Sequence, residues 1–234
     1  MMEFKKYNNV KKIFNKISYK YDFLNSLLSL GLHKLWKKRL VDLLQPINGE
    51  KWADLCCGTG DLSFLIYNKI LPNGSVTGID NAIEILEVAK KKSKLIGNKL
   101  IRWEIKDILE IDNNKQKFDG ICMSYGLRNL VNVEKGMEKM FNLLTDKGRA
   151  GCLDFNHSKE NSLSDLFQKI YLRLIVVPIS KIFQLGNEYS YIEKSIKNYP
   201  EGKKLISIAK KVGFRKVRYL TLFCNQMGIL ILEK

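Results

Sequence analysis

Apolar positions recur at helical spacing through residues 10 to 44, with an interruption near residues 29 to 31. The pattern predicts two or three helices in this first part of the chain. Pro46, Asn48 and Gly49 then form a predicted turn, after which the pattern changes to short apolar runs.

The short apolar runs after the turn alternate with longer segments of helical spacing. The runs, which read as strands, are residues 51–56, 75–80, 99–105, 118–125 and 148–155. Helix candidates lie between them at residues 61–70, 82–95 and 133–144. A strand, helix, strand rhythm of this kind predicts a parallel sheet with right-handed crossovers.

The pattern changes again after residue 156. Residues 162–185 form a predicted amphipathic helical insertion bent at Pro178, a helix follows at about 201–212, and two strands join near Asn225. We therefore expect an α/β fold, Rossmann-like and doubly wound, with a mostly parallel seven-stranded sheet, an antiparallel C-terminal hairpin and an N-terminal helical lid. It would be one domain, 1–234, divided into a lid (1–46), a cofactor-binding core (47–156), an insertion (157–200) and a C-terminal helix and hairpin (201–234).

Composition agrees with a single domain and argues against several kinds of site. Apolar residues make up 45% of the 234 residues, enough for a full core. The five cysteines include no C-x-x-C, and neither histidine lies at ligand spacing from a cysteine pair, so we expect no disulfide framework and no metal. No apolar run approaches the ~18 residues of a membrane span, and the first residues lack an apolar signal core, so we expect a cytoplasmic protein.

The formal charge of +16 is large, and its clearest local excess lies in residues 5 to 39. The basic residues there are Lys5, Lys6, Lys11, Lys12, Lys16, Lys20, Lys34, Lys37, Lys38 and Arg39. Such a surface attracts nucleic acid or anionic membrane, although biased composition alone would also produce it. We expect peripheral contact with a membrane surface through this region, and no obligate protein partner.

The segment DLCCGTGD, residues 54 to 61, follows the first predicted strand and opens a helix. In a doubly wound sheet, this position presents backbone N–H groups to a ligand. Gly58 and Gly60 permit a tight turn and close approach of the backbone. Asp54 and Asp61 would repel a pyrophosphate, so the segment favours a ligand that carries positive charge.

Two further acids follow the next strands. Asp80 lies 20 residues beyond Gly60, where a carboxylate can accept hydrogen bonds from ribose hydroxyls. Asp107 follows the third strand at the rim of the same crevice and suits the amino group of a purine. Either acid alone would read as a helix cap, but together with the loop they predict a nucleoside site.

An acidic strand end followed by G-x-G resembles the class I S-adenosylmethionine-dependent methyltransferases, whose cofactor is a sulfonium cation. The resemblance implies that Asp54, Gly58, Thr59 and Gly60 hold the methionine part of S-adenosylmethionine. It further implies that Asp80 holds the ribose, Asp107 and Ile108 the adenine, and that Ser124 contacts the cofactor. Cys56 and Cys57 then read as small packing residues.

The acceptor is indicated by segments outside this loop. The NPPY motif of base-amino methyltransferases is absent after the fourth strand, and Cys122 lacks the neighbouring proline of cytosine-carbon methyltransferases. Residues 14–38, 124–149 and 189–200 instead resemble the family that methylates a ring carbon in ubiquinone, menaquinone and phylloquinone synthesis. LCCGTGD and QMGILILEK are most similar to its photosynthetic branch, which methylates 2-phytyl-1,4-naphthoquinol. DFNHS and DILEI depart from the family pattern.

Alternatives to this acceptor remain open. One is a demethylmenaquinol or a benzoquinol of the ubiquinone pathway, because the residues that select ring and tail are not readable. Another is a basic nucleic-acid methyltransferase or a cofactor-binding module, and the positive net charge is the only feature that supports it.

The resemblance also yields expected roles at the acceptor. Arg128 would stabilise a phenolate or, equally, fix its loop through an ion pair; Asn129 would bind the second oxygen, and Asp154 would act as a base through a water. The lid and substrate residues would be Tyr19, Tyr21, Asp22, Asn25 and His33, with His33 a packing residue rather than a base. The tail channel, or else ordinary helix packing, would use Leu163, Leu166, Phe167, Ile170, Tyr171 and Leu174.

Overall fold

One mixed sheet of seven strands organises the computed structural model, in the order β3-β2-β1-β4-β5-β7-β6. The structure describes residues 11–13, 15–16, 18–97, 100–113, 116–156, 166, 170–171, 173–174, 178 and 186–234. The strands are β1 (Lys51–Leu55), β2 (Ser75–Asp80), β3 (Ile101–Ile105), β4 (Phe118–Ser124), β5 (Leu144–Phe155), β6 (Lys216–Leu222) and β7 (Met227–Glu233). The first five pair in parallel, and β7 pairs antiparallel with both β5 and β6.

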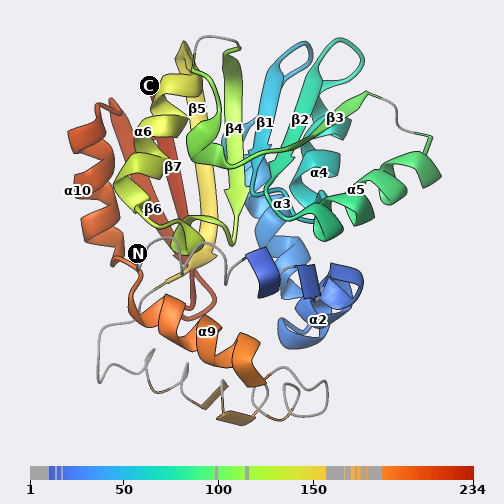
Figure 1. The fold of residues 1–234 in the computed structure, drawn as a ribbon. Helices are drawn as coiled ribbons and strands as arrows, with labels where there is room; N and C mark the ends of the chain where they lie inside the picture. The colour runs from blue at the N-terminus through green and yellow to red at the C-terminus, as the bar shows by residue number, and fades with distance from the viewer. Residues whose placement is uncertain are drawn as a thin grey trace.

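Helices lie on both sides of this sheet and beyond its lower end (Figure 1). The longer ones are α2 (Tyr21–Leu28), α3 (Leu32–Leu44), α4 (Asp61–Ile70), α5 (Ile83–Leu95), α6 (Val133–Leu143), α9 (Gly186–Lys197) and α10 (Gly202–Val212). Short 3-10 helices are η1 (Ser18–Lys20), η2 (Ile108–Glu110) and η3 (Leu127–Asn129). Helices α3 and α4 pack on one face, and α6 and α10 on the other.

Alternation along the strands divides the core into two layers, because successive side chains of a strand point to opposite faces. In β7, Ile229 and Ile231 pack with α3 and α4, whereas Leu230 and Leu232 pack with α6 and α10. The central strands are apolar on both faces, as expected for a sheet covered on both sides.

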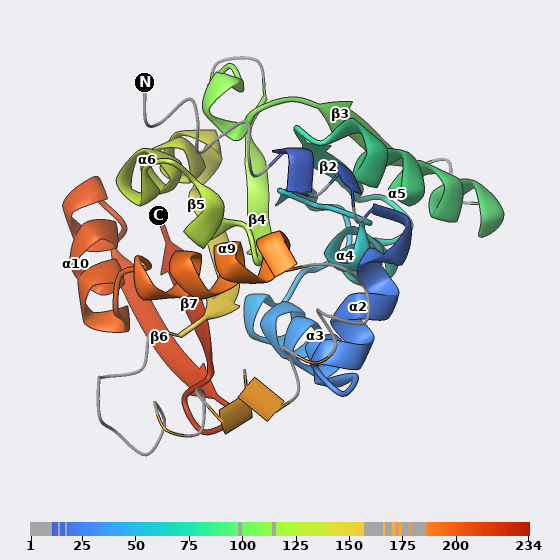
Figure 2. The same cartoon turned by 60° about the horizontal axis from the view of Figure 1, so that its bottom comes forward.

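The carboxyl ends of the parallel strands meet at the lower end of the sheet, where α2 and α9 lie (Figure 2). Strand β1 pairs with β2 on one side and β4 on the other, so the strand order reverses direction there. Loops at such a switch point diverge and leave a crevice, which is where open α/β sheets bind ligands.

The expected fold class is confirmed, including the antiparallel hairpin and helices at 61–70 and near 202–212. One boundary was wrong: the fifth strand begins at Leu144, not at residue 148, because it continues directly from α6. Most of the expected insertion at 162–185 lies outside the described residues, as do Leu163 and Phe167.

A partly buried ion pair joins the start of β1 to β5. Arg149 Nη1 lies 2.7 Å from Glu50 Oε1, and Arg149 Nη2 also donates to the carbonyl of Gln45 at the end of α3. The Glu50 carboxylate accepts a further hydrogen bond from the Trp52 indole. Burial alone would raise the pKa of Glu50, but these hydrogen bonds outweigh it and leave the pKa below its usual value.

Glu50→Gln should therefore lower the free energy of unfolding at pH 7 by about 1.5 to 3 kcal/mol, the range for hydrogen bonds to charged groups. A carboxylate with a depressed pKa stabilises the fold above its unfolded pKa, and this contribution is lost as pH falls through the folded value. The difference between wild type and variant, measured by denaturant unfolding, should shrink in acid. Glu104→Gln is the matched control, because its partner Arg102 is mostly exposed. A difference that grows in acid would contradict this account.

Candidate functional site

The glycine loop between β1 and α4 curls through left-handed backbone conformations. Cys56, Gly58 and Gly60 have φ angles of 54°, 55° and 86°. The loop is fixed to the next strand, since the Cys57 amide donates to the carbonyl of Ile79 at 3.1 Å. A side chain at Gly58 would begin 3.8 Å from the ring of Tyr21, so the glycine leaves room between the loop and the lid.

Trp103 of β3 explains the second glycine of the loop. A Cβ at Gly60 would lie 2.6 Å from the Trp103 ring, and a Cβ at Gly78 would lie 2.4 Å from it. Both distances are far inside van der Waals contact. The indole therefore crosses Gly78 and supports Gly60 from the side of the outer strand.

Asp80 and Asp107, the two acids predicted to bind the nucleoside, follow strands β2 and β3 and accept hydrogen bonds from backbone N–H groups. Asp80 accepts from Gly58 N and Ala82 N, each at 2.9 Å, so it joins the glycine loop to the start of α5. Asp107 accepts from Leu109 N at 2.7 Å and caps η2. Burial raises the pKa of Asp80, although the hydrogen bonds from the backbone oppose this shift.

A pocket at the crevice brings many of the predicted residues together. Those that line it are Tyr21, Gly58, Asp80, Asp107, Ile108, Ser124 and Asn129. Cys56, which the sequence indicated as a packing residue, also lines the pocket. The further lining residues, not singled out from the sequence, are Asn81, Ile85, Lys106, Leu109, Tyr125, Gly126, Leu130 and Val131. Acids thus stand on the β2 and β3 side of the pocket, opposite the turn that follows β4.

Asp54 lies beneath the loop and does not line this pocket. Its Oδ2 accepts from Ser63 N at 2.9 Å and Ser63 Oγ at 2.6 Å, whereas Oδ1 has no partner among the described residues. Burial raises the pKa of Asp54 to about 7 despite the Ser63 hydrogen bonds.

Charged contacts connect the lid to the loop. Thr59 Oγ1 donates to Asp22 Oδ1 at 2.6 Å, and Asp22 also pairs with Lys92 of α5 at 2.5 Å. Asp61 pairs with Lys37 of α3 at 2.7 Å. The Thr59 hydroxyl, which was expected to contact the methionine part of the cofactor, is therefore hydrogen-bonded to the lid residue Asp22.

Lys37 was wrongly counted among the residues of the expected basic surface. Its side chain is only 5% exposed, so it does not belong to a surface patch. Burial would lower the pKa of Lys37, but the attraction of Asp61 outweighs it and raises the pKa. The exposed basic residues of this region include Lys34, Lys38 and Arg39.

The other predicted lid residues do not line the pocket. The Tyr19 ring is 72% exposed and lies under Lys91 Nζ, while Asn25 lies beside Tyr21. His33 is buried, and its Nδ1 is 2.8 Å from Ser29 Oγ. Burial, with a smaller effect of Lys37, lowers the pKa of His33 to about 4, so the imidazole is neutral at pH 7.

A buried ion pair holds the turn between β4 and α6. Arg128 Nη1 lies 2.6 Å from Asp154 Oδ1, and the Arg128 backbone N–H donates to Asp154 Oδ2 at 3.1 Å. Arg128 Nη1 and Asn129 Nδ2 both donate to the carbonyl of Tyr125. Two roles were expected for Arg128, and the structure contains the ion pair with Asp154 that fixes the loop.

Tyr191 of α9 was not predicted to contact this turn. Its hydroxyl donates to Asn129 Oδ1 at 2.9 Å. Burial raises the pKa of Tyr191 to about 12, so the hydroxyl keeps its proton and remains a donor. The segment YSYIEKSIKNYP was noticed as a motif, but nothing in its spacing identifies which residue reaches the turn.

The pocket residues fit S-adenosylmethionine by their chemistry. The glycine cradle at Gly58 leaves space that a Cβ would enter, and the carboxylates of Asp80 and Asp107 line the wall. These groups suit a nucleoside that carries a cationic centre better than a polyphosphate.

Comparisons with known proteins agree with this arrangement. A family model described as the ubiE/COQ5 methyltransferase family matches residues 1–231. A 2-phytyl-1,4-naphtoquinone methyltransferase from Thermosynechococcus vestitus is 37% identical over 226 residues, covering 97% of this chain and 99% of the relative. A chloroplastic 2-phytyl-1,4-beta-naphthoquinone methyltransferase from Arabidopsis thaliana is 36% identical, covering 96% of this chain and 87% of the relative.

Among solved structures, a SAM-dependent methyltransferase from Aquifex aeolicus has a TM-score of 0.61 at 14% identity. The match covers 84% of this chain and 88% of that chain. At this level of identity the likeness concerns the fold.

Asp154→Asn should destabilise the protein by about 3 to 5 kcal/mol, because it leaves the Arg128 cation buried without its partner. The double variant Arg128→Met, Asp154→Asn removes both charges and should recover part of this loss. Denaturant unfolding of the two single variants and the double variant gives the coupling between the residues. Additive losses would contradict a coupled pair.

Proposed function

Because the chain belongs to the ubiE/COQ5 methyltransferase family, we propose that it methylates a ring carbon of 2-phytyl-1,4-naphthoquinol. The protein is a methyltransferase, and its methyl donor is S-adenosylmethionine. The observation that carries the proposed acceptor is identity of 36 to 37% with relatives of that name, over 96 to 97% of the chain. The product would be phylloquinol.

The acceptor in this proposal is the reduced quinol rather than the quinone. Loss of one hydroxyl proton to water pushes electron density onto the neighbouring ring carbon, which then attacks the methyl carbon of the donor. S-adenosylmethionine supplies an electrophilic methyl group, whose bond to sulfur breaks as the bond to the ring carbon forms. The ring carbon loses its own proton afterwards, and aromaticity returns. The protein must orient the two carbons and hold the oxygen anion.

The donor side of the site has assigned roles in this proposal. Asp80 holds the ribose while its backbone contacts keep the glycine loop in place, and Asp107 with Ile108 contacts the adenine. Thr59 and the glycine loop hold the methionine part, with the lid residue Asp22 attached to Thr59. Tyr21 and Ser124 contribute further walls.

On the acceptor side we propose that Arg128 stabilises the phenolate and that Asp154 keeps the guanidinium in place. The bond between Asp154 and Arg128 supports a positioning role for the carboxylate better than a role as base. Asn129 faces the pocket with its amide held by Tyr125 and Tyr191, which supports contact with the second ring oxygen. His33 remains a packing residue in the proposal.

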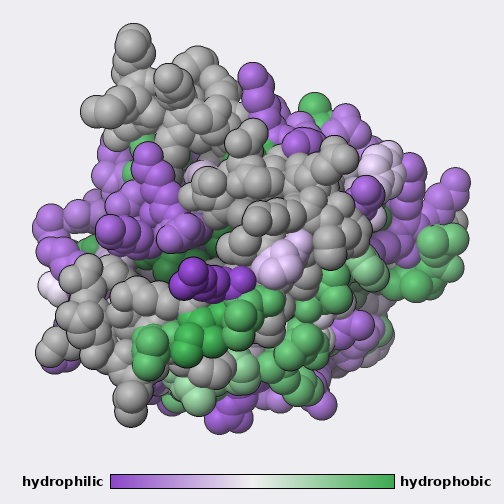
Figure 3. Space-filling view, turned by 90° about the horizontal axis from the view of Figure 1, so that it is seen from below, coloured by the Kyte–Doolittle hydropathy of each residue, from purple (hydrophilic) through white to green (hydrophobic). Residues whose placement is uncertain are grey.

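A membrane surface is the proposed source of the acceptor, because a phytyl tail partitions into lipid. No described helix is both long enough and apolar enough to cross a membrane. The underside of the molecule instead exposes hydrophobic side chains among hydrophilic ones (Figure 3). In the lid and the start of α3, Phe23, Leu30 and Leu35 are exposed. The exposed Lys34 precedes Leu35 in the sequence, and the exposed Lys38 follows one turn later. Apolar insertion with nearby cations is how proteins lie on anionic membranes.

The proposed reaction is tested by transfer of labelled methyl from S-adenosylmethionine to reduced and oxidised naphthoquinones and benzoquinones, with and without phytyl tails. We expect transfer to 2-phytyl-1,4-naphthoquinol and none to the oxidised form, since only the quinol has an electron-rich ring. Asp80→Ala is the control for the donor site and should raise the Kd for S-adenosylmethionine in calorimetry.

Preferred transfer to a benzoquinol, or to a naphthoquinol with a polyprenyl tail, would replace the proposed acceptor by one of these. Transfer to the oxidised quinone would contradict the mechanism. An unchanged Kd for Asp80→Ala would remove Asp80 from the donor site.

The double variant Leu30→Asp, Leu35→Asp should bind anionic liposomes less than wild type does in a sedimentation assay, because the two apolar contacts become charged. Ile47→Asp is the matched control, since Ile47 is 62% exposed just before β1, which starts at the end of the sheet opposite to α2 (Figure 1). Equal binding of wild type to anionic and neutral liposomes would contradict a contribution of the basic residues to membrane binding. An equal loss of liposome binding in the control variant would contradict the proposal that this surface contacts the membrane.

A further inference from the structure

Helix α2 covers part of the loop that is predicted to hold the methyl donor. Thr59 is only 2% exposed, and its hydroxyl donates to Asp22 of α2 at 2.6 Å. Thr59 does not line the pocket at the crevice, whereas its neighbour Gly58 does. A group that is to contact the Thr59 hydroxyl therefore has to take the place of Asp22.

The pocket at the crevice is small while α2 stays in this position. Its volume is about 100 Å³, whereas pockets that hold small ligands measure roughly 300 to 1,000 Å³. A single carbon added to Gly58 would already lie 3.6 Å from Ile85 and 3.8 Å from the ring of Tyr21, which is ordinary van der Waals contact. Tyr21 belongs to α2, so displacement of this helix would enlarge the pocket beside the glycine loop.

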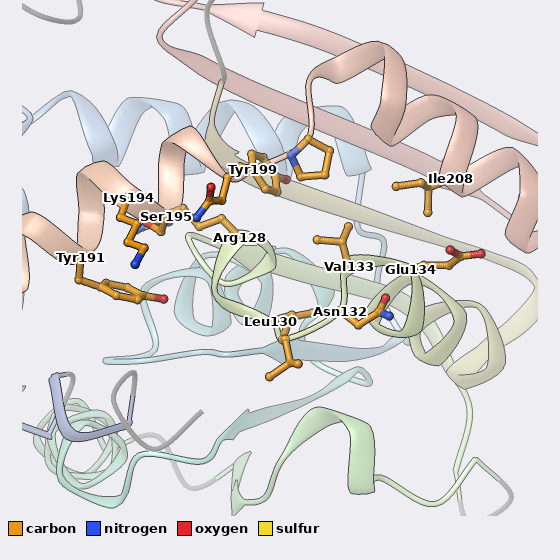
Figure 4. Close-up of a pocket in the computed structure, with 13 residues that line it drawn as sticks. Arg128, Leu130, Asn132, Val133, Glu134, Tyr191, Lys194, Ser195, Tyr199 and Ile208 are labelled. Atoms are coloured by element: carbon orange, nitrogen blue, oxygen red, sulfur yellow. The ribbon is translucent and has the colours of Figure 1, made fainter. Parts of the chain in front are cut away.

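A larger pocket nearby does not offer the donor another place. Its volume is about 440 Å³, and Figure 4 shows that its walls come from the turn after β4 and from helices α6, α9 and α10. None of the described residues that are predicted to bind the donor lines it, and Asp80 and Asp107 line the smaller pocket instead. The smaller pocket is therefore the one that has to open.

Polar contacts contribute much of what holds α2 over the loop. Within α2, which is described throughout, Leu24 alone is buried. Asp22 accepts from Thr59 with one carboxylate oxygen and pairs with Lys92 of α5 through the other, at 2.5 Å. The side chains of Asp22 and Lys92 are 39% and 32% exposed, so their ion pair is weak enough to break and form again.

The segment between α2 and α3 has the features of a hinge. Leu30 and Gly31 have φ angles of 50° and 77°. Among the described residues, no atom lies within 4 Å of the place that a Cβ would take at Gly31. Hinges are a few loop residues that absorb changes in backbone angles. Rotation here would lift Tyr21 and Asp22 from the glycine loop together, while α3 stays packed on the sheet.

We propose that Asp22 and Lys92 hold α2 over the glycine loop as an autoinhibitory contact, which has to break before S-adenosylmethionine reaches Thr59. The apparent Kd for the donor is then the intrinsic Kd divided by the fraction of molecules in which α2 is displaced. Asp22 and Lys92 therefore lower the affinity for the donor, whereas residues that bind the donor raise it. This inference rests on the donor side of the proposed function and is independent of the acceptor.

The first experiment measures the Kd for S-adenosylmethionine by calorimetry on the full chain. Asp22→Asn and Lys92→Met each remove one charge of the pair and should lower this Kd by about threefold, the size expected for a partly exposed ion pair. Lys92→Arg keeps the cation and should retain the wild-type Kd. Lys90→Met is the matched control, because Lys90 lies on the same helix and pairs with Glu87 of that helix rather than with α2. It should bind the donor as wild type does.

Hydrogen exchange of the full chain without donor reports the position of α2 itself. Amides of α2 should exchange about threefold faster in Asp22→Asn and Lys92→Met than in wild type, because α2 is displaced in a larger fraction of molecules. Amides of β4 should exchange at the wild-type rate, since this strand has a hydrogen-bonded partner on each side.

A raised Kd in both variants would overturn the inference, because Asp22 and Lys92 would then bind the donor rather than oppose it. A lowered Kd without faster exchange in α2 would also overturn it, since the effect would not act through this helix. Faster exchange with an unchanged Kd would do the same. Failure of the proposed acceptor would appear only in the methyl transfer assay, where no quinol would be methylated while these Kd and exchange values stay as expected.

Discussion

The ion pair between Arg128 and Asp154 joins the ends of two neighbouring strands, β4 and β5, inside the protein. Both oxygens of the carboxylate are used, one by the guanidinium and one by the Arg128 backbone. The turn therefore cannot move without separating two buried charges, which is costly in a medium of low polarity. Because this turn forms a wall of the pocket at the crevice, the shape of that pocket depends on the pair.

The two sides of the site differ in the charge they present. Carboxylates of Asp80 and Asp107 line the donor side, where we propose that the cationic nucleoside binds. The guanidinium of Arg128 stands in the turn after β4, where the phenolate is proposed. A reaction between a cation and an anion places its partners across such a boundary. Screening by salt is weak for the buried groups, so the arrangement persists at ordinary ionic strength.

The fold, and the gathering of Asp80 and Asp107 at one pocket, were largely predictable because their signals are local. Asp80 and Asp107 each follow an apolar run, and carboxyl ends of parallel strands meet at one edge. The contacts made by distant helices could not be predicted in the same way. Lys37 meets Asp61 across 24 residues and Tyr191 meets Asn129 across 62, so both depend on how distant helices pack. The sequence pattern placed Lys37 on a helix but could not indicate its burial.

Trp103 reaches from an outer strand to the loop that holds the donor, passing over Gly78 and ending at Gly60. Neither glycine can gain a methyl group while the indole stays, and removal of the indole would leave a void beneath the loop. Trp103 and Gly78 therefore form a pair that can change only together, whereas the φ of 86° at Gly60 favours glycine there in any case. Descendants of this sequence that lose the tryptophan need a larger side chain in place of Gly78 to fill the void, so drift at the outer strand is restrained by the strand beside it.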